Sequence, residues 1–458
     1  MDRRAFLGAG VAGGAALALA PRVSLAQERI GKLRPAAARQ SLAGAAHPAT
    51  EVWAYNGAVP GPLLRYRQGE RLRIEVENAL GVGTTVHWHG IRLPNAMDGV
   101  PHLTQAPIAA GGRFTYEFDL PDAGTYWYHP HLGNPEQVSR GLYGALIVEE
   151  RVPPPVDRDI VWVLSDWELD RQARIDEAFR HPMAASHDGR IGNTVTVNGA
   201  VPDRFAVRAG ERIRLRLINA ASARIYDLAF EGHEPTVIAL DGHPVAPHSA
   251  ARLPLGPGMR ADLMLDCTAR PGSQHRVVDR FYPRNAYELL KIAYSAESPL
   301  RAAFAPVAAL PENPVARPDA AAAERHRVVF AGGAMGAMPS QARHKGMFWT
   351  VNGEPMADEH DHHHHAPLLT LSHRRSHVLE LVNETAWYHP IHLHGHTFRI
   401  LSRDGKPPPR EEWSDTVLLP PRSRADIAFV ADNPGGWMFH CHVLEHQASG
   451  MTAVVRVA

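Results

Sequence analysis

The clearest pattern along the chain is an alternation of apolar and polar residues that recurs in three separate stretches. These stretches are Gly69–Asn78, Gly210–Asn219 and His377–Asn383. A period of two is typical of β-strands. Each stretch follows an Asn-Gly pair, at positions 56–57, 198–199 and 352–353, and Asn-Gly is typical of a tight turn between strands. We therefore predict three copies of one β unit.

A second repeated segment supports the same division. Arg260–Leu265 resembles Arg424–Phe429, and Gly112–Phe118 shows the same alternation in the first copy. Little in the chain predicts long amphipathic helices, and its 38 Pro and 38 Gly residues favour a turn-rich β protein. We expect an all-β fold of three consecutive β-sandwich domains.

The boundaries of these domains follow from composition. Pro-rich residues 152–156 separate the first two copies, and the Pro/Ala-rich stretch 297–323 predicts a linker. The predicted domains are residues 40–150, 157–296 and 324–458.

Residues 1–26 have the pattern of a signal peptide. Arg3 and Arg4 form a twin-arginine pair, an apolar stretch of small residues follows, and Ser24-Leu25-Ala26 offers a cleavage site. We expect export in the folded state by the twin-arginine machinery, to the bacterial periplasm or outside the cell.

Composition narrows the candidate functions. Lys plus Arg and Asp plus Glu both number 48, so no net charge attracts nucleic acid. There are 28 His residues but only two Cys residues, Cys267 and Cys441. We expect Cys267 to be a small buried residue, and no intramolecular disulfide if Cys441 binds metal.

Many of the histidines occur as His-x-His pairs, which place both imidazoles on one face of a strand. Four such pairs predict eight convergent ligands: His87, His89, His129, His131, His392, His394, His440 and His442. The pairs occupy equivalent places in the first and third copies, whereas the corresponding segment of the middle copy, residues 228–232, has none. We predict a metal cluster between the first and third domains, with the middle domain as a spacer. His233, His243 and His248 are interpreted as ordinary surface or turn residues.

The C-terminal segment offers a different donor set. On a strand, Cys441 points away from His440 and His442. Cys441, His446, Met451 and one further His would supply the two imidazoles, thiolate and weak axial thioether that are typical of blue-copper sites. His389 is the candidate for the further imidazole.

Together these motifs resemble the multicopper oxidase family in its three-domain form, built from cupredoxin-like Greek-key sandwiches. The similarity covers nearly the whole chain after residue 26 and is greatest to bacterial laccases and periplasmic cuprous oxidases. It implies four copper ions: a type 1 copper, a type 2 copper and a type 3 pair. The implied type 1 ligands are His389, Cys441, His446 and Met451, and the implied type 2 ligands are His87 and His392. The implied type 3 ligands are His89, His129, His131, His394, His440 and His442.

The resemblance also implies an activity. A small reducing substrate, such as a phenol or aromatic amine, would give single electrons near the surface beside His446 or His389. Cys441 would pass them to the cluster, where O₂ is reduced to water. Asp98 resembles the acidic residue that delivers protons, and this is the role we expect; an Asp before Gly99 is also typical of a turn. Gln447 stands where several relatives have Glu, and Gln cannot titrate.

Two alternatives remain open. A cuprous oxidase would recruit Cu(I) through the loop at residues 358–365, where His360, His362, His363, His364 and His365 could bind extra copper. A copper-storage protein would use the same core only structurally, and O₂ uptake would distinguish it. We expect a monomer in each case.

Overall fold

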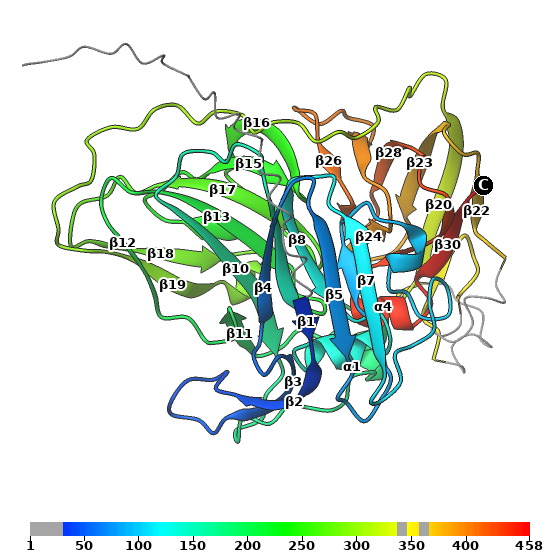
Figure 1. Ribbon diagram of the computed structural model, residues 1–458, viewed down its shortest axis with the longest axis horizontal. Helices are drawn as coiled ribbons and strands as arrows, with labels where there is room; N and C mark the ends of the chain where they lie inside the picture. The colour runs from blue at the N-terminus through cyan, green and yellow to red at the C-terminus, as the bar shows by residue number, and fades with distance from the viewer. Residues whose placement is uncertain (1–30, 337–345, 357–365) are drawn as a thin grey trace, which may run out of the picture.

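The computed structural model describes residues 31–336, 346–356 and 366–458. The predicted signal peptide and the predicted His loop at 358–365 lie outside these ranges. Within them, no helix combines the length and apolar character required to cross a membrane. The regular secondary structure of the described residues is almost entirely β-strand, as predicted, and the strands form three β-sandwich units (Figure 1).

The first unit, blue to cyan at the centre of Figure 1, contains two main sheets and a short ribbon. One sheet has the order β1 (Gly31–Leu33), β5 (Arg71–Glu77), β7 (Arg113–Asp119). The other has the order β4 (Gly61–Arg67), β9 (Gly144–Glu149), β8 (Gly124–His129), β6 (His87–His89), and β2 (Pro35–Gln40) pairs with β3 (Thr50–Tyr55). The turn η1 (Asn95–Met97) and the helix α1 (Asn134–Ser139) connect its strands.

The middle unit, green in Figure 1, has a six-stranded and a four-stranded sheet. The larger has the order β11 (Thr194–Val197), β10 (Arg158–Trp167), β13 (Arg212–Asn219), β17 (Arg260–Asp266), β15 (Thr236–Leu240), β16 (His243–Ser249). The smaller has the order β12 (Arg204–Val207), β19 (Tyr287–Tyr294), β18 (Gln274–Asp279), β14 (Leu228–Phe230). The short helix α2 (Pro182–Ser186) and the turn η2 (Pro283–Asn285) complete it.

The third unit, yellow to red, has a six-stranded and a five-stranded sheet. The first has the order β21 (Trp349–Val351), β20 (Glu324–Gly332), β23 (Ser376–Asn383), β28 (Arg424–Val430), β25 (Phe398–Arg403), β26 (Trp413–Ser414). The second has the order β22 (Leu369–Leu371), β30 (Thr452–Val457), β29 (Gly435–Cys441), β24 (His389–Leu393), β27 (Thr416–Leu419), and the helix α4 (Leu444–Ala448) follows β29.

The predicted repeats have the same structure in all three units. The two repeated strands pair antiparallel each time: β5 with β7, β13 with β17, and β23 with β28. Asn56, Asn198 and Asn352 all have positive φ angles, of 55°, 53° and 51°, and the glycine after each is also positive. Two successive positive φ angles are typical of the type I′ turn, which explains the repeated Asn-Gly pair.

The first and third units share one apolar core, which contains Trp88 and Tyr128 from the first and Trp349 and Trp437 from the third. The middle unit has its own core, and Cys267 is fully buried there, as expected. Between β19 and β20 the chain runs without helix or strand along the top edge of the view in Figure 1. Asn313 in this segment is hydrogen-bonded to both backbone groups of Ala123, at 2.8 and 2.9 Å. The segment therefore also contacts the first unit.

Candidate metal centre

Cys441 lies at the end of β29, and its sulfur faces two imidazoles. Its Sγ is 3.5 Å from His389 Nδ1 and 3.7 Å from His446 Nδ1, and the two nitrogens are 3.2 Å apart. A point equidistant from the corners of such a triangle is about 2 Å from each, which is the length of a metal–imidazole bond. These three donors therefore fit one metal ion, and the set of a thiolate and two imidazoles suits copper.

The outer nitrogens of both rings are held by neutral groups. The Nε2 of His389 is 2.8 Å from the hydroxyl of Thr385, which itself donates to Asn383. The Nε2 of His446 donates to the backbone carbonyl of His187, at 2.6 Å. Because each Nε2 carries the proton, each Nδ1 presents a lone pair to the triangle.

Burial keeps these donors ready for a cation. Burial lowers the pKa of His389 well below its usual value and lowers that of His446 to about 3, so both rings are neutral. Burial raises the pKa of the Cys441 thiol, which will lose its proton when a cation compensates the thiolate. Met451 is fully buried in the same core, and its carbonyl accepts a hydrogen bond from the Cys441 amide at 3.0 Å.

The eight His-x-His imidazoles lie together between the first and third units, and none is more than 2% exposed. Strand register brings them together, because His87 pairs with His129 across β6 and β8, and His392 pairs with His440 across β24 and β29. Rings from the two units then stack on one another: His87 on His394 with centroids 3.9 Å apart, and His89 on His392 at 3.8 Å.

Several nitrogens of these neighbouring imidazoles have no hydrogen-bond partner among the described residues. The buried nitrogens are His87 Nε2, His89 Nδ1, His129 Nε2, His392 Nε2 and both nitrogens of His131 and His442. In addition, His394 Nε2 faces His440 Nε2 at 3.1 Å. Buried polar atoms without partners cost free energy, so this cluster fits a group of metal ions.

Two carboxylates lie directly behind the imidazoles. Asp98, which follows η1, is 1% exposed, and its Oδ2 is 2.9 Å from His394 Nδ1. His87 Nδ1 is 2.8 Å from the backbone carbonyl oxygen of Asp98 and 3.2 Å from its Oδ1. Asp98 was predicted from the sequence. Its carboxylate joins a ring of the third unit to a ring of the first.

The second carboxylate, Asp415, was not predicted. Its Oδ1 is 3.1 Å from His89 Nε2 and 3.3 Å from His392 Nδ1. Burial alone would raise the pKa of Asp415, but Arg260 and the hydrogen bonds from His392 and His89 hold it well below its usual range. No repeat or motif singles out Asp415, because its partners lie far away in the chain.

The two centres are linked through Cys441. The flanking residues His440 and His442 belong to the imidazole cluster, and His440 Nδ1 is 2.9 Å from the Cys441 carbonyl oxygen. The sulfur and the two rings therefore lie on opposite faces of one strand end, as alternation predicts.

One other expectation needs correction. His243 is not a surface residue: it is 2% exposed, and its Nε2 is 3.1 Å from Thr397 Oγ1. The side chains of His389 and His446 are buried beside Trp349, and the partly exposed His187 lies next to His446. The side-chain amide oxygen of Gln447 accepts a hydrogen bond from the Asn134 side chain at 3.3 Å.

Comparison with known proteins agrees with this architecture. Three family models, each described as multicopper oxidase, match residues 37–153, 158–288 and 337–458. Multicopper oxidase MmcO of Mycobacterium tuberculosis is 32% identical over 98% of this chain and 95% of its own length. Laccase-2 of Botryotinia fuckeliana is 28% identical over 87% of this chain and 77% of its own.

Solved structures give the same result. The crystal structure of a multicopper oxidase from Pseudomonas thermotolerans superposes with a TM-score of 0.81 and 35% identity, covering 94% of this chain and all of that one. A Campylobacter jejuni multicopper oxidase, described as a metallo-oxidase, gives a TM-score of 0.77 and 26% identity over 93% of this chain and 90% of that one.

The chain belongs to the multicopper oxidase family. It is a copper-dependent oxidase with four copper ions in type 1, type 2 and type 3 sites. It couples the one-electron oxidation of a reducing substrate to the four-electron reduction of O₂ to water.

Proposed function

We propose that twelve residues hold the four coppers of this oxidase. His389, Cys441, His446 and Met451 bind the type 1 copper, and His87 and His392 bind the type 2 copper. His89, His129, His131, His394, His440 and His442 bind the type 3 pair. The observation that supports this most directly is the 3.2–3.7 Å triangle at Cys441, joined by the backbone to two rings of the imidazole cluster.

When bound, the coppers accept four single electrons and, with four protons, reduce O₂ to two waters. The protein residues determine the path of both. Cys441 is the electron conduit, because its sulfur contacts one centre while the adjacent peptides lead to His440 and His442 in the other. This covalent path is only a few bonds long.

Asp98 is proposed to deliver protons to the cluster. Its two oxygens contact His87 and His394 from different units, so a proton on this carboxylate is next to both rings. Gln447 has no proton to give, which supports Asp98 as the main relay. The direct test is O₂ uptake by Asp98→Asn, treated in the Discussion.

The reducing substrate is proposed to be a phenol, an aromatic amine or a similar small molecule. We propose that its electrons cross the segment after α2, because the His187 carbonyl accepts a hydrogen bond from the outer nitrogen of the His446 ring. The His187 ring packs against Trp387 with centroids 5.1 Å apart, and both rings are partly exposed. We propose that the reductant docks at these two rings.

Cu(I) is the alternative substrate, and two exposed methionines favour it. Met183 and Met335 are 59% and 74% exposed, and their segments are joined by a hydrogen bond from the Ala334 amide to the Ser186 carbonyl. Thioethers favour Cu(I), so these side chains could deliver it near His187. The predicted His loop, with His360 and His362–His365, would add further copper sites.

O₂ consumption by the copper-loaded protein distinguishes the two substrates. One series uses 2,6-dimethoxyphenol, and the other uses Cu(I) held by a weak chelator. Both are repeated with the double variant Met183→Leu and Met335→Leu, and after deletion of residues 358–365. A laccase retains phenol oxidation in every variant, whereas a cuprous oxidase loses Cu(I) oxidation selectively. Absence of O₂ uptake with both substrates at full copper loading would contradict the ligand assignment.

The remaining proposals concern the whole chain. We propose that residues 1–26 direct export by the twin-arginine machinery to the periplasm or the exterior, and that the protein is a monomer. We also propose domains at residues 40–150, 157–296 and 324–458, with a linker at 297–323.

A further inference from the structure

The middle unit contributes none of the proposed copper ligands, yet its chain forms one wall of the imidazole cluster. Gly258, with φ of +84°, lies so close that a Cβ there would be 2.8 Å from the His442 ring and 3.0 Å from the His89 ring. Only glycine fits this position without moving a ring. The middle unit is therefore more than a spacer at this point.

Two residues later, Arg260 begins β17 and is fully buried. Its guanidinium binds Asp415 of the third unit with two parallel hydrogen bonds, of 2.9 and 2.6 Å. Its Nε donates to the Thr125 carbonyl of the first unit at 3.1 Å, and Asp241 of the middle unit lies 3.3 Å away. The guanidinium therefore contacts all three units, and the paired bonds fix the plane of the Asp415 carboxylate.

Asp415 in turn fixes which nitrogen of two imidazoles carries the proton. Its carboxylate accepts from His89 Nε2 at 3.1 Å, and its backbone carbonyl accepts from His392 Nδ1 at 2.8 Å. Carboxylate and carbonyl oxygens only accept, so these two nitrogens are protonated. The lone pairs are left on His89 Nδ1 and His392 Nε2, the two nitrogens that have no partner among the described residues.

We propose that Arg260 is a positioning residue for the trinuclear copper site, which acts through Asp415 to set the donor atoms of His89 and His392. The proposal rests on the copper ligands assigned above and adds a role for the middle unit. Arg260 and Asp415 are both buried, and neither is among the proposed copper ligands.

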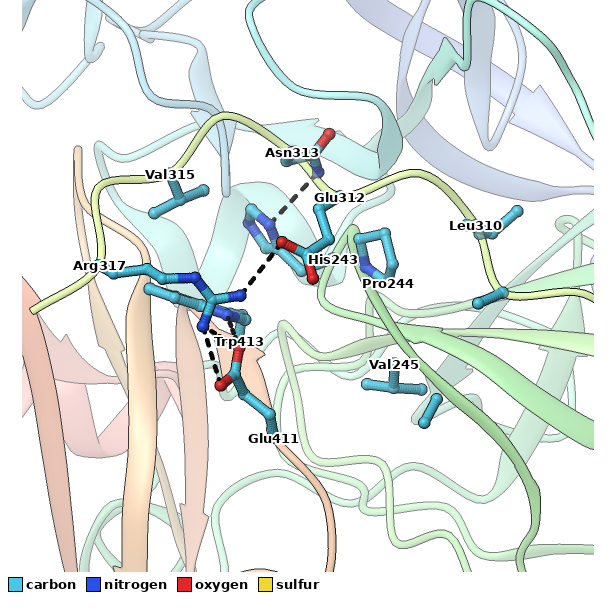
Figure 2. A pocket seen from close by; sticks show the side chains of 12 residues that line it. His243, Pro244, Val245, Leu310, Glu312, Asn313, Val315, Arg317, Glu411 and Trp413 are labelled. Carbon is cyan, nitrogen blue, oxygen red and sulfur yellow. Dashed lines mark hydrogen bonds and ion pairs between the residues drawn. The ribbon is translucent and has the colours of Figure 1, made fainter.

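Arg260 and Asp415 are both fully buried. Outside this contact lies a cleft of about 380 Å³ between the middle unit, the linker and the third unit (Figure 2). His243 and Trp413 line this cleft, and the buried residues Asp241 and Ser414, near them in the chain, are joined by a hydrogen bond. The negative charges of Asp241 and Asp415 together exceed the single positive charge of Arg260. The guanidinium therefore adds no net positive charge beside the copper cluster.

Arg214 provides a matched control. It is also a buried arginine of the middle unit, with its side chain 1% exposed. It binds Glu150 of the first unit at 2.8 Å and Asp262 at 2.7 Å, neither of which lies behind the imidazole cluster. Substitution of Arg214 disturbs a buried ionic network without changing the partners of any proposed ligand.

The experiment compares copper-loaded Arg260→Lys with Arg214→Lys and the native protein. Lysine keeps the charge but cannot form the paired bonds. Copper per chain, the type 2 electron paramagnetic resonance spectrum, the blue type 1 absorption and the thermal midpoint are measured. We expect both variants to lose thermal stability and keep the blue absorption. Only Arg260→Lys should change the type 2 spectrum or lose that copper, with kcat reduced about 10- to 100-fold for every reductant.

A native type 2 spectrum and full copper content in Arg260→Lys would overturn the proposal and leave Arg260 as an ordinary interdomain ion pair. Asp415→Asn gives the same decision if Arg260→Lys does not fold. The native protein offers a test without any variant: in its copper-loaded crystal structure, copper bound at His89 Nε2 would also overturn the proposal. Failure of the native protein to bind four coppers would instead contradict the proposed ligands.

Discussion

The two proposed copper centres are both fully buried, but the protein compensates a cation differently in each. At the Cys441 triangle the negative charge comes from the thiolate itself, and the outer partners are neutral: the Thr385 hydroxyl and the His187 carbonyl. The imidazole cluster has only neutral donors, and its negative charges, Asp98 and Asp415, lie behind the rings. A buried cation needs a compensating anion, either as a ligand or directly behind one.

Removal of the Cys441 thiolate should have the largest effect, because it should abolish one centre and leave copper in the other. Cys441→Ser loses the soft anionic ligand, so we expect no blue absorption and a fall in kcat of about 10³-fold or more. The imidazole cluster should retain copper because its ligands are unchanged. Copper per chain and the visible spectrum test this; persistence of the blue absorption in the variant would refute the assignment of Cys441.

Removal of a charge behind the cluster should have the next largest effect. Asp98→Asn keeps the size of the side chain but loses the proton it delivers, so we expect kcat for O₂ uptake to fall about 10²- to 10³-fold. The blue absorption and its rate of reduction by substrate under nitrogen should not change. The exposed residue Asp119, 2.8 Å from Arg71, gives the control variant Asp119→Asn. Equal activity in the two variants would exclude Asp98 as the proton relay.

His243 tests whether burial without copper is enough to keep a histidine neutral. Burial lowers its pKa to about 4, whereas an unfolded chain protonates this residue near 6.5. Between these values the unfolded state binds more protons, so this histidine adds stability above pH 6.5 that is lost as the pH falls toward 4.

The effect amounts to about 3 kcal/mol at most. Denaturant unfolding of the native protein and of His243→Gln, from pH 7.5 to pH 4, measures it. The stability difference between the two should shrink as the pH falls. The control is His248→Gln on the same strand, and a difference that does not vary with pH for His243→Gln would contradict the prediction.

The smallest expected effect concerns the neutral partners of the triangle. Thr385→Val removes the hydroxyl that accepts from His389 Nε2, which leaves a buried N–H without a partner and costs about 1–2 kcal/mol of stability. The blue absorption should shift slightly, while the type 2 resonance spectrum stays native. Thermal unfolding and the two spectra are the measurements. A change in the type 2 spectrum would contradict the view that each centre depends only on its own surrounding groups.

Much of the fold could be predicted from local pattern, because strand alternation and turn chemistry depend on neighbouring residues. The alternating segments became β5, β13 and β23, and the Asn-Gly pairs adopt the expected turns. His-x-His spacing also predicted which rings share a face. Reasoning from neighbouring residues gave a wrong prediction for His243, which was expected at the surface. Its burial depends on contacts with Thr397 and the linker, which are distant in the chain.

The order of residues in the chain determined the donor chemistry: which strands carry imidazoles, and that Cys441 points away from its histidine neighbours. Only the tertiary structure decided how the charges around those donors are balanced. Arg260 and Arg424 occupy the same place in the repeat, yet Arg424 is exposed whereas Arg260 is buried against Asp415. The physical reason is that electrostatic partners are set by distance in space, and three units must pack together before Arg260 can reach Asp415.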